Sequence, residues 1–271
     1  MDIFKEIEEN NFFSSPNIIS KYKKDDTKVV SLIQEASRCG YIKTLKLIKK
    51  HFFDIFIKNI NIVLINLVIN NNKEGIKYFL NKNNIDFSKE NVNINADFLT
   101  FAAKQGNLEL VKLIIENKNF LNNIQGKFNE AILKAAEKNK PNVVLYLLST
   151  NNIHFKFVSN RILMYFARHG DIKLCKKIIE YDKNSIFTPE PLIYSCEYNH
   201  IDIVKYLIST KKFNPSALNN ICILNAYDKK QDSLLKLLFE YPEVRETLFY
   251  DSQKVYNYAM KFDIEKKIKN F

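Results

Sequence analysis

A short pattern of residues recurs along most of this 271-residue chain. Residues 99–114 and 192–207 show it best, with an apolar stretch containing small residues, a break, and a second amphipathic stretch. The breaks fall at Gly40, Asn72, Gly106, Asn139, Gly170, Asn199 and Lys229. The intervals between them are 32, 34, 33, 31, 29 and 30 residues. A near-constant period of this size is typical of stacked repeats, in which a surface rather than one catalytic pocket carries the function.

Each unit is predicted to be a hairpin of two helices. The first helix is short, as in residues 130–138, and its pair of alanines lets a neighbouring backbone approach closely. Gly or Asn at the break tolerates the positive φ with which helices commonly end. The second helix has apolar residues at spacings of three and four, as at Leu108, Val111, Ile114 and Ile115. Because neither helix buries its apolar face alone, neighbouring hairpins must stack.

Several segments match a known repeat consensus. Residues 199–208 read Asn-His-Ile-Asp-Ile-Val-Lys-Tyr-Leu-Ile and agree in character with G-H-L-E-I-V-K-L-L-L at nearly every position. Residues 102–113 agree as closely, and residues 188–192 are similar to the segment T-P-L-H. On these residues, and over about 31–240 in total, the chain resembles the ankyrin-repeat family. Tetratricopeptide repeats have a similar period but need a Trp or large aromatic residue, and this chain has no Trp. Armadillo and HEAT repeats are longer.

The resemblance implies an all-α fold, namely an ankyrin-type solenoid of helical hairpins with about seven repeats and atypical terminal caps. We expect residues 1–30 to form an N-terminal helical cap, 31–240 the repeat array, and 241–271 a C-terminal partial repeat or cap. The segments where the family places its G-A-D-V-N loop lack the usual Gly, so we expect plain connecting loops. These segments are 83–87, 151–155 and 211–215.

The chain carries a formal net charge of +11 at pH 7. Such an excess raises the hypothesis of an electrostatic binder of nucleic acid or anionic membrane, because Lys and Arg neutralise phosphates. The basic residues are nevertheless spread over nearly every repeat and interleaved with Asp and Glu, which is typical of solvated helix faces. Only short clusters occur, such as 21–24 and 266–269. We therefore expect no nucleic-acid partner, and we retain the electrostatic binder as the alternative function.

The residues that usually carry catalysis or bind cofactors form no constellation here. The five glycines build neither a phosphate-binding loop nor a dinucleotide motif, and no G-x-S-x-G segment occurs. The histidines lack ligand-spaced partners; they are His51, His154, His169 and His200. The cysteines form no C-x-x-C pair and are interpreted as buried thiols; they are Cys39, Cys175, Cys196 and Cys222. We expect no enzymatic activity, no cofactor and no metal.

Targeting signals are also missing from the sequence pattern. The first ten residues are acidic where a secretory signal is basic. The most hydrophobic stretch, 52–69, contains charged and amide side chains that are costly in lipid. We interpret this stretch as the end of one repeat, a loop and the start of the next. The expected protein is an intracellular monomer with no transmembrane segment, in the cytoplasm, with the nucleus as the alternative.

In the ankyrin architecture the first helices and loops line a concave groove, and the residues just before each break point toward it. The resemblance therefore implies partner-binding residues at Arg38, Asn70, Asn71, Lys104, Gln105, Glu137, Lys138, Arg168, His169, Glu197, Tyr198, Tyr227 and Asp228. They mix charged, amide and aromatic groups, as recognition surfaces do. The leading hypothesis is a scaffold or adaptor that binds a partner protein, of unknown identity, on its concave face. Two other interpretations are exposed helix ends without a role and an array with no strong single partner.

Overall fold

The computed structural model describes residues 25–81, 83–85, 97–116, 127–150, 156 and 158–269. The regular structure within these ranges is helical, with no strand. The chain divides into two compact units, Met1–Ile153 and His154–Phe271.

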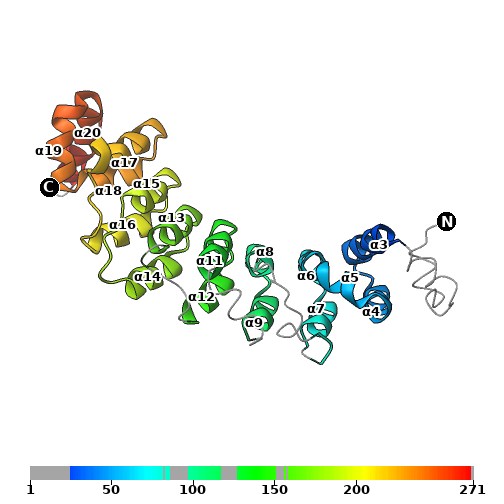
Figure 1. The fold of residues 1–271 in the computed structure, drawn as a ribbon. Helices are drawn as coiled ribbons and strands as arrows, with labels where there is room; N and C mark the ends of the chain where they lie inside the picture. The colour runs from blue at the N-terminus through cyan, green and yellow to red at the C-terminus, as the bar shows by residue number, and fades with distance from the viewer. Residues whose placement is uncertain are drawn as a thin grey trace. The chain divides into compact units, whose positions relative to one another are not determined.

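The described residues of the first unit form four helical hairpins (Figure 1). In each, a first helix, the A-helix, is joined by a tight turn to a second, the B-helix. The A-helices are α3 (Asp26–Cys39), α6 (Ile60–Ile69), α8 (Asp97–Gln105) and α11 (Phe128–Glu137). The B-helices are α4 (Ile42–His51), α7 (Lys73–Leu80), α9 (Leu108–Glu116) and α12 (Pro141–Ser149). Between α4 and α6, where the sequence predicted a loop, the chain forms the short helix α5 (Phe53–Lys58).

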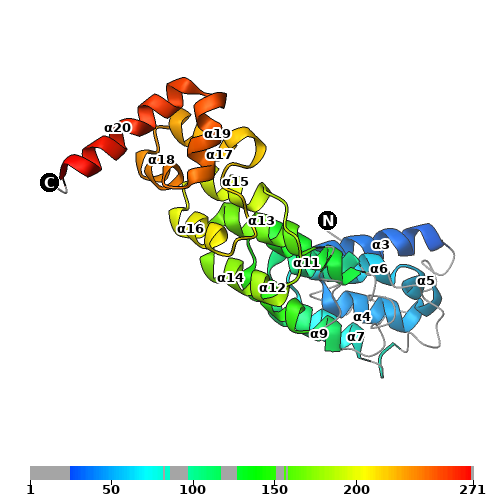
Figure 2. The same cartoon turned by 90° about the vertical axis from the view of Figure 1, so that its left-hand side faces the viewer.

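The second unit repeats the hairpin three times and ends in a further pair of helices. Its A-helices are α13 (Ser159–His169), α15 (Glu190–Glu197) and α17 (Ala217–Asp228). Its B-helices are α14 (Ile172–Tyr181), α16 (Ile201–Ser209) and α18 (Asp232–Phe239). In the final pair, α19 (Pro242–Asp251) packs on α17 and α20 (Gln253–Lys269) on α18, as Figure 2 shows.

Within each unit the A-helices pack side by side. Helix α6 lies between α3 and α8, and α11 packs on the other side of α8; α15 likewise lies between α13 and α17. The alanine pairs at 102–103 and 135–136 are fully buried, so they allow the close approach of α8 and α11 that the sequence predicted. Phe98 and Phe128, from the same two helices, are buried as well. The core of each unit is therefore a continuous layer between its rows of A- and B-helices.

Seven A-to-B turns close in the same way. Each has one residue in the left-handed region, with φ between 51° and 81°, at Gly40, Asn71, Gly106, Asn139, Gly170, Asn199 and Lys230. The next N–H donates to a carbonyl five residues earlier, at N···O distances of 2.8–3.1 Å. These donors are Tyr41, Asn72, Asn107, Lys140, Asp171, His200 and Gln231. The bond satisfies one of the last helix carbonyls, which otherwise lack an intrahelical partner. The α19–α20 connection differs, because Ser252 has a φ of −155°.

Two of the predicted breaks are wrong by one residue. Asn72 has a φ of −84° and Lys229 a φ of −87°, so neither is the left-handed residue. Asn71 and Lys230 take that conformation instead. At both sites the sequence offers no Gly: the first has three consecutive asparagines and the second two lysines. The packing of the flanking helices, rather than the type of the turn residue, therefore determines which residue adopts the left-handed conformation.

The ends of the array are described in part. Helix α3 begins at Asp26, so residues 26–30, expected in the N-terminal cap, belong to the first A-helix. Asp25 is the N-cap of that helix, and residues 1–24, also expected to belong to the cap, lie outside the described residues. So does the predicted loop segment 151–155, whereas 211–215 is described and contains no strand. None of the helices in the described ranges has the length and apolar character needed to cross a membrane.

Candidate protein-interaction site

The predicted binding residues lie at the ends of the A-helices, and the common turn gives every repeat the same register. We number positions from the left-handed residue. Position −2 holds Arg38, Ile69, Lys104, Glu137, Arg168, Glu197 and Asp228. Position −1 holds Cys39, Asn70, Gln105, Lys138, His169, Tyr198 and Lys229, and all seven are exposed. Two predicted residues fall elsewhere, because Asn71 is itself the left-handed residue and Tyr227, at position −3, is half-buried.

Three of the side chains at position −1 donate a hydrogen bond to the preceding repeat. The Asn70 amide donates to the Arg38 carbonyl at 2.8 Å, and the Gln105 amide donates to the Ile69 carbonyl at 3.1 Å. In the second unit the Lys229 ammonium donates to the carbonyl of Glu197 at 3.2 Å. The acceptor in every case is the carbonyl at position −2 of the repeat before. Because this is an A-helix C-terminal carbonyl, these bonds satisfy exposed helix ends and link neighbouring repeats.

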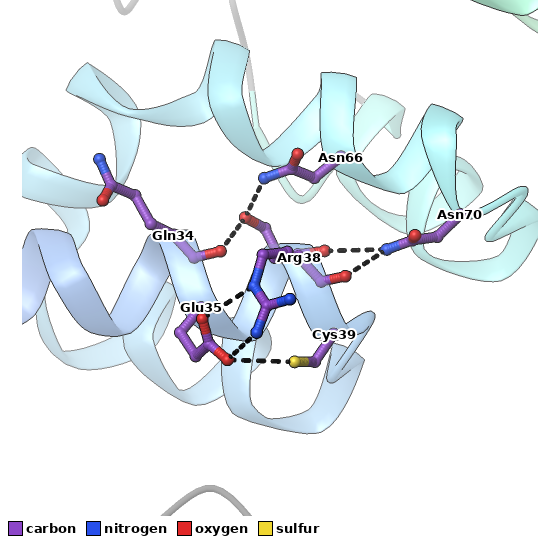
Figure 3. Close-up of polar contacts among 7 residues, drawn as sticks. Gln34, Glu35, Arg38, Cys39, Asn66 and Asn70 are labelled. Carbon is purple, nitrogen blue, oxygen red and sulfur yellow. Dashed lines mark hydrogen bonds and ion pairs between the residues drawn. The ribbon is translucent and has the colours of Figure 1, made fainter.

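The junction between α3 and α6 shows the most extended of these contacts (Figure 3). Asn66 Nδ2 donates to Ser37 Oγ at 2.8 Å, and that hydroxyl donates to the Gln34 carbonyl at 2.9 Å. Asn70 Nδ2 lies 3.3 Å from the Ser37 carbonyl in addition to its bond to Arg38. Ser37 is fully buried, so the network fixes the end of one A-helix against the next.

Arg38 and Cys39, at the end of α3, share one acidic partner. The Arg38 guanidinium pairs with Glu35 at 2.5 Å, and the Cys39 thiol donates to the same carboxylate at 3.4 Å (Figure 3). The hydrogen bond from Arg38 lowers the pKa of Glu35. Cys39 is exposed, and the prediction that it is a buried thiol is therefore wrong. Its place at position −1, on the outer end of the helix, explains the exposure.

Glu137 and Asn71 are also engaged. Glu137 pairs with Lys134 at 2.9 Å and with Lys138 at 3.6 Å. The hydrogen bond from Lys134 lowers the pKa of Glu137. Asn71 Oδ1 accepts a hydrogen bond from the side-chain amide of Asn107, one repeat later. The polar side-chain atoms of these two predicted residues are therefore already engaged within the protein, which leaves fewer of them to bind a partner.

Arg168 and Tyr198 form a stacked pair in the second unit. The guanidinium carbon lies 5.3 Å from the centroid of the tyrosine ring, within the range of a cation–π contact. The Tyr198 ring also stacks with the ring of His200, with centroids 6.4 Å apart and an interplanar angle of 11°. His200 Nε2 lies 3.0 Å from the Arg168 carbonyl. Tyr198 remains 44% exposed, so a partner can still reach it.

The next turn of the second unit carries further aromatic contacts. Tyr227 meets Tyr258 edge to face, with centroids 5.1 Å apart, and Lys254 lies 5.7 Å from the Tyr227 centroid. Lys229 pairs with the Glu197 carboxylate at 3.6 Å. The structure describes His169 and Asp228 as exposed.

In the first unit the structure brings three predicted residues together. Lys104, Gln105 and Lys138 line a recess of about 390 Å³ at the ends of α6, α8 and α11. Sequence reasoning missed its other lining residues, Ile69, Phe101 and Lys140. The correct turn register would have found Ile69, because it places this residue at position −2 next to Asn70.

The repeat geometry agrees with a comparison between the sequence and known families. A family model that describes ankyrin repeats in three copies matches twice, over residues 64–159 and 163–248. The two matches cover more than half of the 271 residues. This chain belongs to the ankyrin-repeat family. The first hairpin of this ankyrin-repeat protein, α3–α4, precedes both matches but closes with the same turn at Gly40. No curated protein is significantly similar in sequence.

Ankyrin repeats are generally protein–protein interaction modules, and ankyrin-repeat proteins are typically non-enzymatic. Within the described ranges, no three His, Cys, Asp or Glu side chains gather where they could hold a metal ion. Three of the four thiols are buried. Burial raises the pKa of Cys175, whereas a hydrogen bond with Cys222, followed by burial, raises that of Cys196. These three thiols are therefore suited to packing rather than to nucleophilic chemistry.

Proposed function

We propose that this ankyrin-repeat protein is a scaffold or adaptor that binds a partner protein through the ends of its A-helices. The observation that carries the proposal is the set of side chains at positions −2 and −1, exposed at all seven −1 positions and at five of the seven −2 positions, and held on turns of one geometry. Because every turn is fixed by the same hydrogen bond, binding needs little ordering of the backbone.

The Arg168–Tyr198 pair is the strongest candidate for a binding hot spot. Arg and Tyr are enriched among the residues whose truncation weakens protein interfaces most. Here the two side chains already contact each other, at 5.3 Å, and Tyr198 is 44% exposed. A partner that covers the pair would gain buried aromatic area without first having to order these side chains.

The test is affinity capture from source cells, at low and high salt, followed by mass spectrometry. The variant Arg168→Ala/Tyr198→Ala is compared with wild type and with Lys176→Ala/Tyr206→Ala. The second variant is a matched control, because Lys176 Nζ lies 5.5 Å from the Tyr206 ring centroid but on the B-helices α14 and α16. Both variants lose one positive charge and one tyrosine. Thermal unfolding of each variant checks that the fold is retained.

A partner protein that persists at high salt, is lost with the first variant and is retained with the control supports the proposal. Equal loss with both variants contradicts it, because the binding then does not depend on the A-helix ends. Salt-sensitive recovery of nucleic acid or lipid, unchanged by either variant, would favour the electrostatic binder instead.

A further inference from the structure

The recess at the ends of α6, α8 and α11 has an apolar floor at a position where other repeats are charged. Ile69 occupies position −2, whereas the remaining repeats place there Arg38, Lys104, Glu137, Arg168, Glu197 and Asp228. Ile69 is 49% exposed, and Phe101 from the neighbouring helix α8 is half-buried beside it in the recess lining. An apolar side chain that stays half exposed at this otherwise charged position gains only part of the free energy of burial in the free protein, and a bound partner would supply the rest.

The rim of the same recess is made of lysines. Lys104, Lys138 and Lys140 line it, and no carboxylate does. Lys104 and Lys140 have no ion pair among the described residues. Lys138 has one, to Glu137 at 3.6 Å, but that carboxylate is more closely paired with Lys134 at 2.9 Å. The rim therefore retains positive charge that no carboxylate of the described residues neutralises fully.

Lys140 stands where a different residue type would serve the fold better. It is the N-cap of α12, and its side chain makes no capping hydrogen bond. The N-caps Asn72, Asn107 and Asp171, at the same place in other repeats, each accept a backbone N–H. Tyr41, His200 and Gln231 make no such bond, but none of them carries the ammonium group of a lysine. A cation is unfavourable at the positive end of a helix dipole, so Lys140 adds positive charge to the rim without helping to cap α12.

Gly106 makes room for the Lys140 stem. A Cβ built on Gly106 would lie 2.5 Å from Lys140 Cδ, so any other residue there would have to displace the lysine side chain. The lysine therefore passes directly over the turn that follows α8, toward the recess that Lys104 and Gln105 also line. The glycine of one repeat and the lysine of the next are in this way matched to each other at the rim of the recess.

We infer that this recess binds an acidic segment of a partner protein, with one apolar side chain on Ile69 and Phe101 and flanking carboxylates on the three lysines. Charge complementarity selects the carboxylates, and the floor selects the apolar residue between them. A nucleic-acid backbone would use the lysines but leave the isoleucine without a partner. The inference rests on the proposed function, since it names the chemistry of the segment that one part of the interaction surface recognises.

The test measures binding of a fluorescent peptide, a leucine flanked on each side by three glutamates, to the full chain by anisotropy. Two further peptides replace either the glutamates by glutamine or the leucine by glycine. The rim variant is Lys104→Gln/Lys138→Gln/Lys140→Gln, and the floor variant is Ile69→Ser. The control variant, Lys43→Gln/Lys50→Gln/Lys58→Gln, removes the same charge from exposed lysines of α4 and α5 in the same unit.

We expect the rim variant to bind the acidic peptide about tenfold more weakly, and the control variant to bind it within about twofold of wild type. The floor variant and the glycine peptide should each lose several-fold in affinity, and the glutamine peptide should bind no variant measurably. Circular dichroism shows whether each variant is folded. Ile69 is half exposed, so serine there leaves the core intact.

Three outcomes would overturn the inference. The first is equal loss of affinity in the rim and control variants, which would indicate attraction by net charge alone. The second is binding of the glycine peptide as tightly as the leucine peptide, or no binding of either at about 1 mM. The third is tighter, rim-dependent binding of a single-stranded oligonucleotide. If a partner captured in cells still depends on Arg168 and Tyr198 in any of these cases, the proposed function stands and only the recess assignment fails.

Discussion

The side-chain amide of Asn70 donates a hydrogen bond to the main-chain carbonyl of Arg38, one repeat earlier, at 2.8 Å. The same amide nitrogen lies 3.3 Å from the Ser37 carbonyl. An exposed side chain at the proposed interaction surface is therefore also part of the contact between two repeats. Gln105 repeats the arrangement one hairpin later, at 3.1 Å from the Ile69 carbonyl. Substitutions at position −1 will for this reason change stability as well as binding.

The first prediction separates these two effects. Asn70→Ala removes a hydrogen bond to a helix-terminal carbonyl and should lower the free energy of unfolding by about 1 kcal/mol. Arg38→Ala should leave it nearly unchanged, because the ion pair that the Arg38 side chain makes among the described residues, with Glu35, lies on an exposed face. Urea denaturation of both variants is the measurement. Equal effects of the two substitutions would contradict the assignment.

The second prediction concerns the turn between α17 and α18. Lys230 has a φ of 54°, which is unfavourable for a residue with a Cβ, so Lys230→Gly should stabilise the protein by about 0.5–1 kcal/mol. Lys229→Gly should destabilise it, because Lys229 has a φ of −87° and its ammonium binds the Glu197 carbonyl. Changes of opposite sign in the free energy of unfolding, measured by urea denaturation, would confirm the position of the left-handed residue. If glycine stabilises at 229 and not at 230, the turn is assigned wrongly.

The third prediction tests how closely neighbouring turns fit. Gly170 has a φ of 80°, and a Cβ there would lie 2.7 Å from the ring of His200, one repeat later. Gly170→Ala should cost about 2 kcal/mol, from the left-handed backbone and from displacement of a ring that contacts the Arg168 carbonyl. Thermal and urea denaturation measure the loss. Its control is Asn199→Gly at the equivalent position, where φ is 59° and stability should stay level or rise.

A double-mutant cycle divides the cost of Gly170→Ala into its two parts. In the background of His200→Ala the steric component should disappear, while the backbone component remains. Additive effects of the two substitutions would show that the methyl group and the ring do not meet.

Much of the fold follows from the sequence, because the repeat period and the glycines at 40, 106 and 170 mark turns that only a few conformations can close. The family match and the helical hairpins confirm this prediction. Where Gly is absent, the sequence pattern leaves the left-handed residue undecided between neighbours, as at Asn71 and Lys230. Helix packing then decides the register, and a single sequence does not reveal it.

The interaction site is less predictable for the same reason. Because the left-handed residue of the second turn was predicted one residue too late, Ile69 was missed as a surface residue, although its neighbour Asn70 was predicted. Lys140 and Phe101 lie outside the two positions that the family resemblance indicates. Phe101 lies one turn before Lys104 on α8, and the packing of α11 on α8 brings Lys140 to the same recess. The sequence also does not reveal which charged side chains pair within the protein. Glu137 pairs with Lys134 and Arg38 with Glu35, so these two predicted residues have less free charge for a partner than the sequence indicates.

The fourth prediction concerns the thiols. Cys39 is exposed at the end of α3, whereas Cys175, Cys196 and Cys222 are 0%, 0% and 1% exposed. The thiolate is the reactive form, and the pKa values of Cys175 and Cys196 are raised, so these two stay protonated at neutral pH. A thiol-reactive maleimide should therefore modify the native protein rapidly at Cys39 alone, and at all four cysteines in denaturant.

Peptide mapping by mass spectrometry locates the label, and Cys39→Ser should abolish the rapid reaction. Rapid native labelling of Cys196 or Cys222 would instead mean that α15 and α17 separate readily, which the tight A-helix packing of the second unit argues against.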